Sequence, residues 1–260
     1  MTYSTLKLEK SDQIATITLT RPEKRNAISS QMIQELLAAL DEVESGAGRV
    51  VIITGSGKAF CAGMDLDDLG AIAAQSPAEN IADSRNMAKM FYRIYSFPKP
   101  VISAVNGAAI AGGCGIATLA DFTLAVPAAK FGYTEVKIGF IPALVSVFLR
   151  RQIGEKHAID LLLTGRIIDA AEAYKLGMVS EVVPAETLIP RSRAIAEQLI
   201  AASPSSIART KRLLHRYHDE AIRAELELAI HENAEIRGTP DFREGVASFL
   251  EKREPKWTGR

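Results

Sequence analysis

Three segments of the chain carry residues that could do chemistry. The first is GSGKAFCAGMDL, residues 55–66, which directly follows the β-branched run RVVIIT. Its glycines, Gly55, Gly57 and Gly63, leave the main chain open, so a ligand could approach backbone N–H groups closely. In α/β proteins, ligands bind at loops of this kind, at the carboxyl ends of strands. Alone, the segment is equally compatible with a tight structural turn.

The glycines of this first segment do not complete a nucleotide-binding motif. A dinucleotide fingerprint requires glycine where the chain has Phe60, and a phosphate loop requires Ser or Thr where it has Ala59. Asp65 could cap a following helix. The open backbone is therefore the feature of interest.

The second segment is VNGAAIAGGCGIA, residues 105–117, which follows the apolar run PVISAV. Gly112 and Gly113 stand at the expected start of a helix. Unpaired N–H groups and the helix dipole favour negative charge at such a terminus. The alternative is close helix packing through small residues.

The two glycine-rich segments have more meaning together. Each follows a buried strand, so each could direct one backbone N–H toward the same oxygen atom. Two such donors form an oxyanion hole, and losing one donor typically costs about 10²–10³ in rate.

The third segment is KFGYTEVKIGFIPA, residues 130–143, and it contains Glu135. Aromatic and aliphatic neighbours, among them Phe131, Val136 and Phe140, could raise the pKa of this carboxyl, as proton transfer requires. On its own, a lone glutamate is more often a solvated surface charge, so both interpretations stay open.

The elements that position these segments follow from hydrophobic periodicity. Apolar residues alternate in 13–20, whereas helical spacing governs 29–45, with Ser29 or Ser30 as cap and Gly46 and Gly48 at the end. Strands are predicted at 49–54, 100–105 and 121–126, and helices near 81–96 and 113–120. Strands that lead into helices through glycine turns indicate an α/β fold of βαβ-like units.

The chain becomes mainly helical after about residue 144, with helices expected at 205–217, 219–237 and 241–251. We predict an α/β core with the ligand site over residues 1–195 and a C-terminal helical region over 196–260. An apolar helical face beyond the core indicates self-association, most often with closed symmetry.

Composition excludes several classes of function. The 260 residues carry no net charge, which argues against nucleic-acid or anionic-membrane partners. No apolar stretch reaches the ~18–20 residues of a membrane span, and the N-terminus lacks a signal peptide, so we expect a cytoplasmic protein.

Two cysteines and four histidines show no metal-binding spacing, and the histidines are expected on solvated faces. Ser96 and Lys99 have Ser-x-x-Lys spacing but no glycine elbow, so acyl-enzyme chemistry is not expected.

Beyond these patterns, the sequence resembles the enoyl-CoA hydratase/isomerase family, also called the crotonase family. The likeness extends over almost the whole chain. The segments that carry it are RPEKRNAI (21–28), KAFCAGMDL (58–66), KPVISAVNGAAIAGGCGIA (99–117), KFGYTEVKIGFIP (130–142), LLLTGRIIDAAEAYKLGMVSEVV (161–183) and EGVASFLEKREPKW (244–257).

The resemblance implies a fold and a set of site residues. The fold would be a crotonase-like spiral of repeated ββα units, with C-terminal helices that mediate a homotrimer or a dimer of trimers. The amides of Met64 and Gly112 would hold the thioester oxygen as it becomes an enolate, and Glu135 would move protons. CoA would belong to the substrate, and no separate cofactor is implied. Its binding residues would be Lys24, Arg25, Ala27, Ala62, Asp65 and Leu66, with Phe249 and Lys252 supplied by a neighbouring subunit.

One departure from the family affects the reaction. Hydratases of the family usually have a second glutamate at the position of Gly115. A single carboxylate suits proton transfer between the α and γ carbons, so Δ3,Δ2-enoyl-CoA isomerisation is slightly favoured over hydration of a 2-enoyl-CoA. Tyr133 could help to hold a water, and Ala143, Leu144 and Val145 are expected to narrow or reshape the acyl pocket. A non-catalytic acyl-CoA-binding protein is the third hypothesis.

Overall fold

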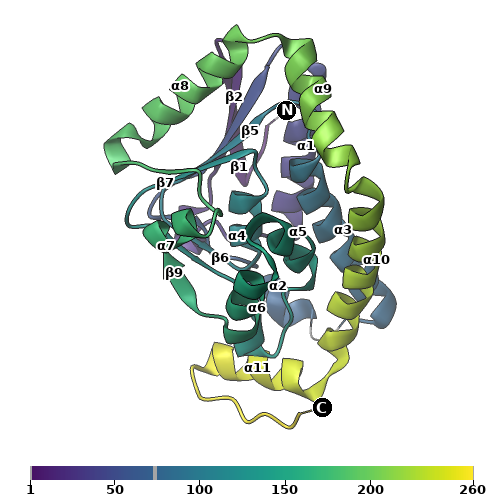
Figure 1. Ribbon diagram of the computed structural model, residues 1–260. Helices are drawn as coiled ribbons and strands as arrows, with labels where there is room; N and C mark the ends of the chain where they lie inside the picture. The colour runs from purple at the N-terminus through teal and green to yellow at the C-terminus, as the bar shows by residue number, and fades with distance from the viewer. Residues whose placement is uncertain (1, 73–74, 260) are drawn as a thin grey trace.

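A computed structural model describes residues 2–72 and 75–259, except for the side chains of Leu66 and Asp67 (Figure 1). Its strands form two sheets. The six-stranded sheet has the order β1 (Leu6–Ser11), β2 (Ile14–Leu19), β3 (Val50–Gly55), β5 (Val101–Val105), β7 (Phe122–Ala125) and β10 (Glu181–Val182). The four-stranded sheet has the order β4 (Ala59–Cys61), β6 (Ala108–Ile110), β8 (Lys130–Gly132) and β9 (Ile167–Asp169).

The centre of the large sheet is parallel and buried. Strands β2, β3, β5 and β7 pair in parallel, and every residue of β5 and all but the last of β3 are buried. Continuous apolar runs are typical of strands that are covered on both faces. The strands predicted at 49–54, 100–105 and 121–126 are therefore confirmed to within a residue or two. The alternation in residues 13–20 corresponds to β2, and β1 precedes it from Leu6.

The chain repeats a strand–strand–helix unit. Strands β3, β5 and β7 of the large sheet are each followed by a short strand of the small sheet and then by a helix, as in β3, β4 and α2 (Leu66–Ile72). The same order recurs in β5, β6 and α4 (Gly112–Thr118). The spiral of ββα units that the resemblance implies is confirmed. Our sequence interpretation treated β4 and β6 as loop, because strands of three small residues show no periodicity.

The caps of the first long helices explain where those helices begin. The Ser29 hydroxyl accepts a hydrogen bond from the Met32 N–H at 3.2 Å and starts α1 (Ser30–Ser45), as predicted. Ser76 and Glu79 form a capping box, so α3 (Pro77–Tyr95) begins four residues before the predicted position. The remaining helices of this part are α5 (Ala143–Ile153), α6 (Glu155–Thr164) and α7 (Ala170–Lys175).

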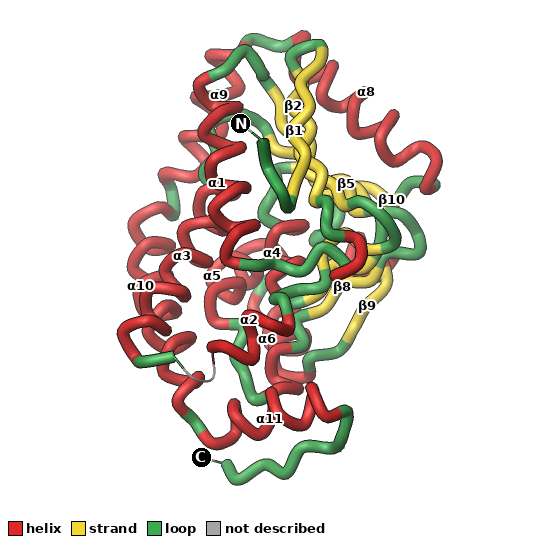
Figure 2. The backbone as a smooth tube through the Cα atoms, turned by 180° about the vertical axis from the view of Figure 1, so that it is seen from behind, coloured by secondary structure: helices red, strands yellow, loops and turns green. Residues whose placement is uncertain are grey.

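The last part of the chain is helical, with α8 (Leu188–Ala201), α9 (Pro204–Arg216), α10 (Asp219–Glu235) and α11 (Pro240–Glu251). Helix α8 packs against β3, β5 and β7, whereas α10 packs against α3 and α5. Figure 2 shows α1, α3 and α10 side by side along one flank, with the strands on the other. Because α8 runs through residue 195, it joins the two regions; the division there stays a prediction, as does the trimer.

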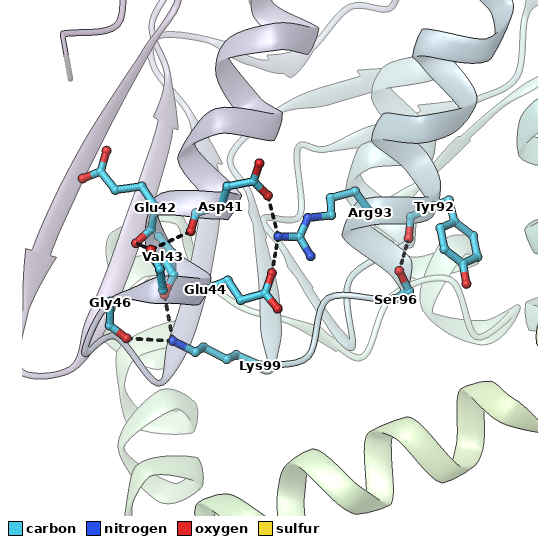
Figure 3. A network of polar contacts seen from close by, with 10 residues as sticks. Asp41, Glu42, Val43, Glu44, Gly46, Tyr92, Arg93, Ser96 and Lys99 are labelled. Atoms are coloured by element: carbon cyan, nitrogen blue, oxygen red, sulfur yellow. Dashed lines mark hydrogen bonds and ion pairs between the residues drawn. The ribbon is translucent and has the colours of Figure 1, made fainter.

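Polar contacts join the end of α1 to the segment that follows α3 (Figure 3). Lys99 Nζ donates to the carbonyl oxygens of Val43 at 2.7 Å and Gly46 at 2.9 Å. These carbonyls belong to the helix end, where the last turn leaves acceptors without a helical partner. The Ser96 hydroxyl instead donates to the Tyr92 carbonyl at 2.7 Å. Ser96 and Lys99 thus form separate hydrogen bonds that hold the backbone.

One histidine departs from the expected solvated position. His215 is half-buried, and its ring stacks on Tyr95 with centroids 4.4 Å apart, because α9 folds back over the end of α3. His157, His218 and His231 are exposed, as predicted. Within residues 2–72 and 75–259, no helix combines the length and apolarity that a membrane crossing requires.

Candidate active site

The first arm of the site is the loop around Met64. A parallel bridge joins Met64 to Ile28: the Ile28 N–H donates to the Gly63 carbonyl at 2.7 Å, and the Asp65 N–H donates to the Ile28 carbonyl at 2.8 Å. These bonds fix the Met64 peptide while leaving its own N–H without a partner among the described residues. The loop therefore presents one unused backbone donor.

The second arm is the start of α4. Ala111 has φ 51° and ψ −126°, a strained conformation for a residue with a side chain, and its N–H donates to the Gly132 carbonyl at 2.7 Å. The next N–H, that of Gly112, is the first of the helix and has no partner among the described residues. A second backbone donor is thus held by a strained turn.

The two arms pack against each other through glycines. A Cβ on Gly113 would lie 2.2 Å from the Cys61 carbonyl oxygen, and one on Gly63 would lie 3.2 Å from Ala111 Cβ. Glycine is required at these positions because any side chain would push the arms apart. Met64 and Gly112 consequently line the same cavity.

Glu135 lies on the wall of that cavity, at the start of the short helix η2 (Glu135–Ile138). Its side chain is buried, and Oε2 has no hydrogen-bond partner among the described residues. Burial raises the pKa of Glu135 to about 7, since no cation nearby stabilises the carboxylate. The sequence segment around Glu135 predicted such a shift.

The cavity that these three residues share has an otherwise largely apolar lining. Ile28, Met87, Phe91 and Leu144 contribute to its walls, and the space within it amounts to about 540 Å³, part of which opens to solvent. A mostly apolar cleft with a few convergent polar groups is typical of a small-molecule site. The arrangement could stabilise an oxyanion and transfer a proton beside it.

The loop predicted to bind CoA borders the Met64 arm. Lys24 and Arg25 are exposed and Ala27 is buried, while Ala62 donates its N–H to the Arg25 carbonyl at 3.1 Å. Our sequence interpretation missed Asn26, whose side-chain amide donates to the carbonyls of Ser56 at 2.9 Å and Ala59 at 2.8 Å. Its place between Arg25 and Ala27 in the family-like segment was the available signal.

Asp65 has a structural partner. Its carboxylate accepts a hydrogen bond from Arg21 Nη2 at 2.5 Å, and Lys24 Nζ lies 3.7 Å away. The carboxylate is buried, so this ion pair fixes the loop 21–27 against the Met64 arm. A direct contact of Asp65 with CoA stays a prediction. The side chain of Leu66, also predicted to bind CoA, lies outside the described residues.

Phe249 and Lys252 stand apart from the cavity, on exposed positions at the end of α11. The resemblance assigns them to the site of a neighbouring subunit, and that assignment stays a prediction.

The place of the missing acid is filled by apolar side chains. A Cβ on Gly115 would lie 2.8 Å from Val145 Cγ1 and 3.1 Å from the Phe91 ring. The described residues that line the cavity include no carboxylate besides Glu135. Tyr133 does not line it either; its hydroxyl lies 3.3 Å from Thr118 Oγ1 inside the core.

Two polar residues of the cavity wall come from the C-terminal region, Asn233 of α10 and Arg237 just beyond it. Our sequence interpretation missed both. Their spacing continues the apolar stripe of Ile222, Leu226 and Ile230, which was the available signal that they face inward. Among the described residues, no group of three or more His, Cys, Asp or Glu could hold a metal ion.

Comparison with known proteins shows what this chain resembles. A protein of Thermus thermophilus whose name contains "enoyl-CoA hydratase" is 43% identical over 245 residues, covering 94% of this chain and 97% of that protein. The crotonyl-CoA hydratase of Syntrophomonas wolfei is 34% identical over 267 residues, with both chains covered completely. The crystal structure of an enoyl-CoA hydratase/isomerase from Xanthobacter autotrophicus Py2 superimposes with a TM-score of 0.90 at 32% identity, covering 97% of this chain and 98% of that one.

The family profile described as "Enoyl-CoA hydratase/isomerase" matches residues 9–260, which include Met64, Gly112, Glu135 and the C-terminal helices. With this match over nearly the whole length, the chain belongs to the enoyl-CoA hydratase/isomerase family.

Proposed function

We propose that this enzyme converts enoyl-CoA thioesters through an enolate whose oxygen is held by the N–H groups of Met64 and Gly112. Glu135 is the acid and base. The proposal is carried by the convergence on a single cavity of two backbone donors and one buried carboxyl oxygen, Glu135 Oε2, none of which has a hydrogen-bond partner among the described residues. No separate cofactor is proposed, because CoA is part of the substrate; hydration also consumes one water molecule.

The two kinds of group contribute differently. The backbone donors stabilise charge that develops on the oxygen, an effect worth about 10²–10³ in rate for each donor. Because the pKa of Glu135 is about 7, both of its protonation states are populated near neutral pH. The same carboxyl can therefore accept a proton and return it within one turnover.

The names of the relatives favour hydration over the isomerisation that we predicted from the missing acid. The relative from Syntrophomonas wolfei is called a crotonyl-CoA hydratase. In this reaction Glu135 takes a proton from water. At the same time the water oxygen forms a bond to C3, and the enolate is generated. The carboxyl then returns that proton to C2, which restores the thioester carbonyl.

Isomerisation is the second candidate, because one carboxylate is sufficient for it. Val145 and Phe91 occupy the space above Gly115, where the second acid would stand. In this reaction Glu135 removes a proton from C2 of a 3-enoyl thioester and delivers it to C4. The double bond moves into conjugation, with no water to be positioned.

CoA and the assembly complete the proposal. Lys24, Arg25, Ala27 and Ala62 are proposed to contact the pantetheine and nucleotide, because their loop borders the Met64 arm. Phe249 and Lys252 of a neighbouring subunit would reach the nucleotide in a trimer. Their exposure at the end of α11 leaves them available for such a contact.

The test of the proposed function is a pair of spectroscopic assays. Hydration removes the conjugated absorbance of crotonyl-CoA, whereas isomerisation of a 3-enoyl-CoA creates it. In the Glu135→Gln variant, the rate of either reaction should fall about 10²–10⁴-fold, while the affinity for butyryl-CoA stays near that of the wild type. Glu186→Gln, at an exposed glutamate, is the control. A fully active Glu135→Gln enzyme would remove this carboxyl from the mechanism.

A further inference from the structure

The wall contributed by Asn233 and Arg237 holds a buried cation beside the acyl cavity. Arg237 is 2% exposed, and its guanidinium lies 5.6 Å from the ring centre of Phe140. Both Arg237 and Phe140 line the same cavity as Glu135. An alkyl chain would require only apolar side chains at this place.

Most of the guanidinium is committed to fixed partners. Its Nη1 donates to Asp83 Oδ2 at 2.8 Å, and its Nη2 donates to Asn233 Oδ1 at 2.9 Å. The Ser84 hydroxyl donates to the same Asn233 oxygen at 2.8 Å. These bonds orient both Arg237 and Asn233 firmly.

Two donors of this wall remain unused. Arg237 Nε is buried and has no hydrogen-bond partner among the described residues. The Asn233 amide nitrogen also forms no hydrogen bond to them. A buried donor without a hydrogen-bond partner is destabilising, so an acceptor is expected to reach this wall in the working enzyme.

We propose that this wall binds an oxygen atom near the far end of the acyl chain. The preferred substrates are then enoyl-CoA thioesters whose chain ends in a hydroxyl, carbonyl or carboxyl group rather than in a methyl group. Arg237 Nε and the Asn233 amide nitrogen donate to that oxygen. This inference rests on the proposed function, because it names the class of acyl group on which Glu135 acts.

Charge indicates which oxygen suits the wall best. Asp83 balances the guanidinium through a 2.8 Å ion pair, so a second carboxylate would enter with no free positive charge to meet it. An uncharged hydroxyl or carbonyl oxygen accepts the same hydrogen bonds without that cost. Nε is shielded from solvent, so the acyl chain has to displace the side chains that cover Nε before its oxygen can bind there.

The test uses saturated thioesters, which bind but cannot react. Alkanoyl-CoA, ω-hydroxyalkanoyl-CoA and ω-carboxyalkanoyl-CoA thioesters with backbones of four to eight carbons are titrated into the wild-type enzyme by calorimetry. At one length, an oxygen-ended thioester should bind about tenfold tighter than the alkyl thioester, with the hydroxyl ahead of the carboxylate. Alkyl thioesters that bind as tightly at every length would overturn the inference.

Variants assign the preference to the wall. Arg237→Lys keeps a cation for Asp83 but removes Nε, and Asp83→Asn/Arg237→Met removes the ion pair as a unit. Each should abolish the oxygen preference while leaving alkyl thioester binding within about threefold. Arg85→Met is the matched control, because Arg85 lies on α3 like Asp83 but pairs with Glu227 at the surface. The wild-type titration decides the question even if a variant fails to fold.

The two proposals fail in different ways. Intact turnover with no preference for an oxygen-ended chain would reject only this inference. Absence of turnover on every enoyl-CoA, with the preference still present in binding, would reject the proposed function and leave the polar wall as a recognition site.

Discussion

Two walls of one cavity each bury an ionisable side chain, and they differ in how its charge is balanced. Glu135 has no ion-pair partner among the described residues, and burial raises its pKa to about 7. Arg237 is also buried but is paired with Asp83 at 2.8 Å. A buried group without a counter-charge can change its protonation state near neutral pH, whereas a paired one keeps its charge and can only orient what it binds.

The two walls also come from different parts of the chain. Glu135 follows the short strand β8, inside the repeated ββα core, whereas Arg237 belongs to η4 (Ile236–Gly238), which joins α10 to α11. Under the proposed function, the core therefore holds the group that transfers protons, and the helices after it contribute the wall proposed to bind the acyl chain. On that proposal, changes at the Arg237 wall would leave Met64, Gly112 and Glu135 in place.

The largest expected effect is the pH dependence of the Glu135 wall. Attack by water and removal of the C2 proton both need the ionised carboxylate in the free enzyme. With a pKa of about 7, kcat/KM should fall about tenfold for each pH unit below that value and level off above it. Initial rates from about pH 5 to pH 9, with butyryl-CoA binding as the control, measure this. A flat profile would show that the carboxyl titrates elsewhere.

The second prediction concerns the wall that contains Arg237 and the free energy of unfolding. Asp83→Asn leaves the guanidinium buried without its counter-charge, at a cost of about 3 kcal/mol in the free energy of unfolding. Asp83 is 20% exposed, so solvent reduces this cost. Adding Arg237→Met removes the stranded charge and should recover much of the loss in urea denaturation. If the two effects are simply additive, the pair does not act as a unit.

The sequence predicted the residues of one wall but not those of the other. Met64, Gly112 and Glu135 line one cavity, and short-range glycine and apolar patterns mark the segments that hold them, while their catalytic roles stay predictions. Asn233 and Arg237 were missed, because their role depends on where α10 packs against α3 and α5. The helical stripe indicates that both residues face inward, but the local sequence does not show which distant cavity they reach.

The fold shows the same limit. Local sequence patterns predict the long strands and the helix capped by Ser29. Strands β4, β6 and β8 instead depend on pairing between segments that are distant in the sequence. The filled space above Gly115 is also a tertiary property. Val145 lies thirty positions away in sequence and reaches this glycine only because α5 packs against α4.

A smaller effect is expected when this space is crowded further. Gly115→Ala would place a Cβ 2.8 Å from Val145 Cγ1, and such overpacking costs about 1–3 kcal/mol in the free energy of unfolding. In a Val145→Ala background the added cost should shrink, because the opposing methyl group is gone. Urea denaturation of the four proteins measures the coupling. Equal costs in both backgrounds would mean that the Phe91 ring, and not Val145, limits the space.

The smallest effect is expected at Tyr133, two residues from Glu135 but with a partner for its hydroxyl. Tyr133→Phe removes the 3.3 Å contact with Thr118 and should cost at most about 1 kcal/mol in the free energy of unfolding. Because Tyr133 does not line the cavity, hydration and isomerisation should both stay within about twofold of the wild type. A selective loss of hydration would instead mean that Tyr133 helps to hold the water. The Glu135 wall would then contain a second working group, and its contrast with the paired Arg237 wall would have to include Tyr133.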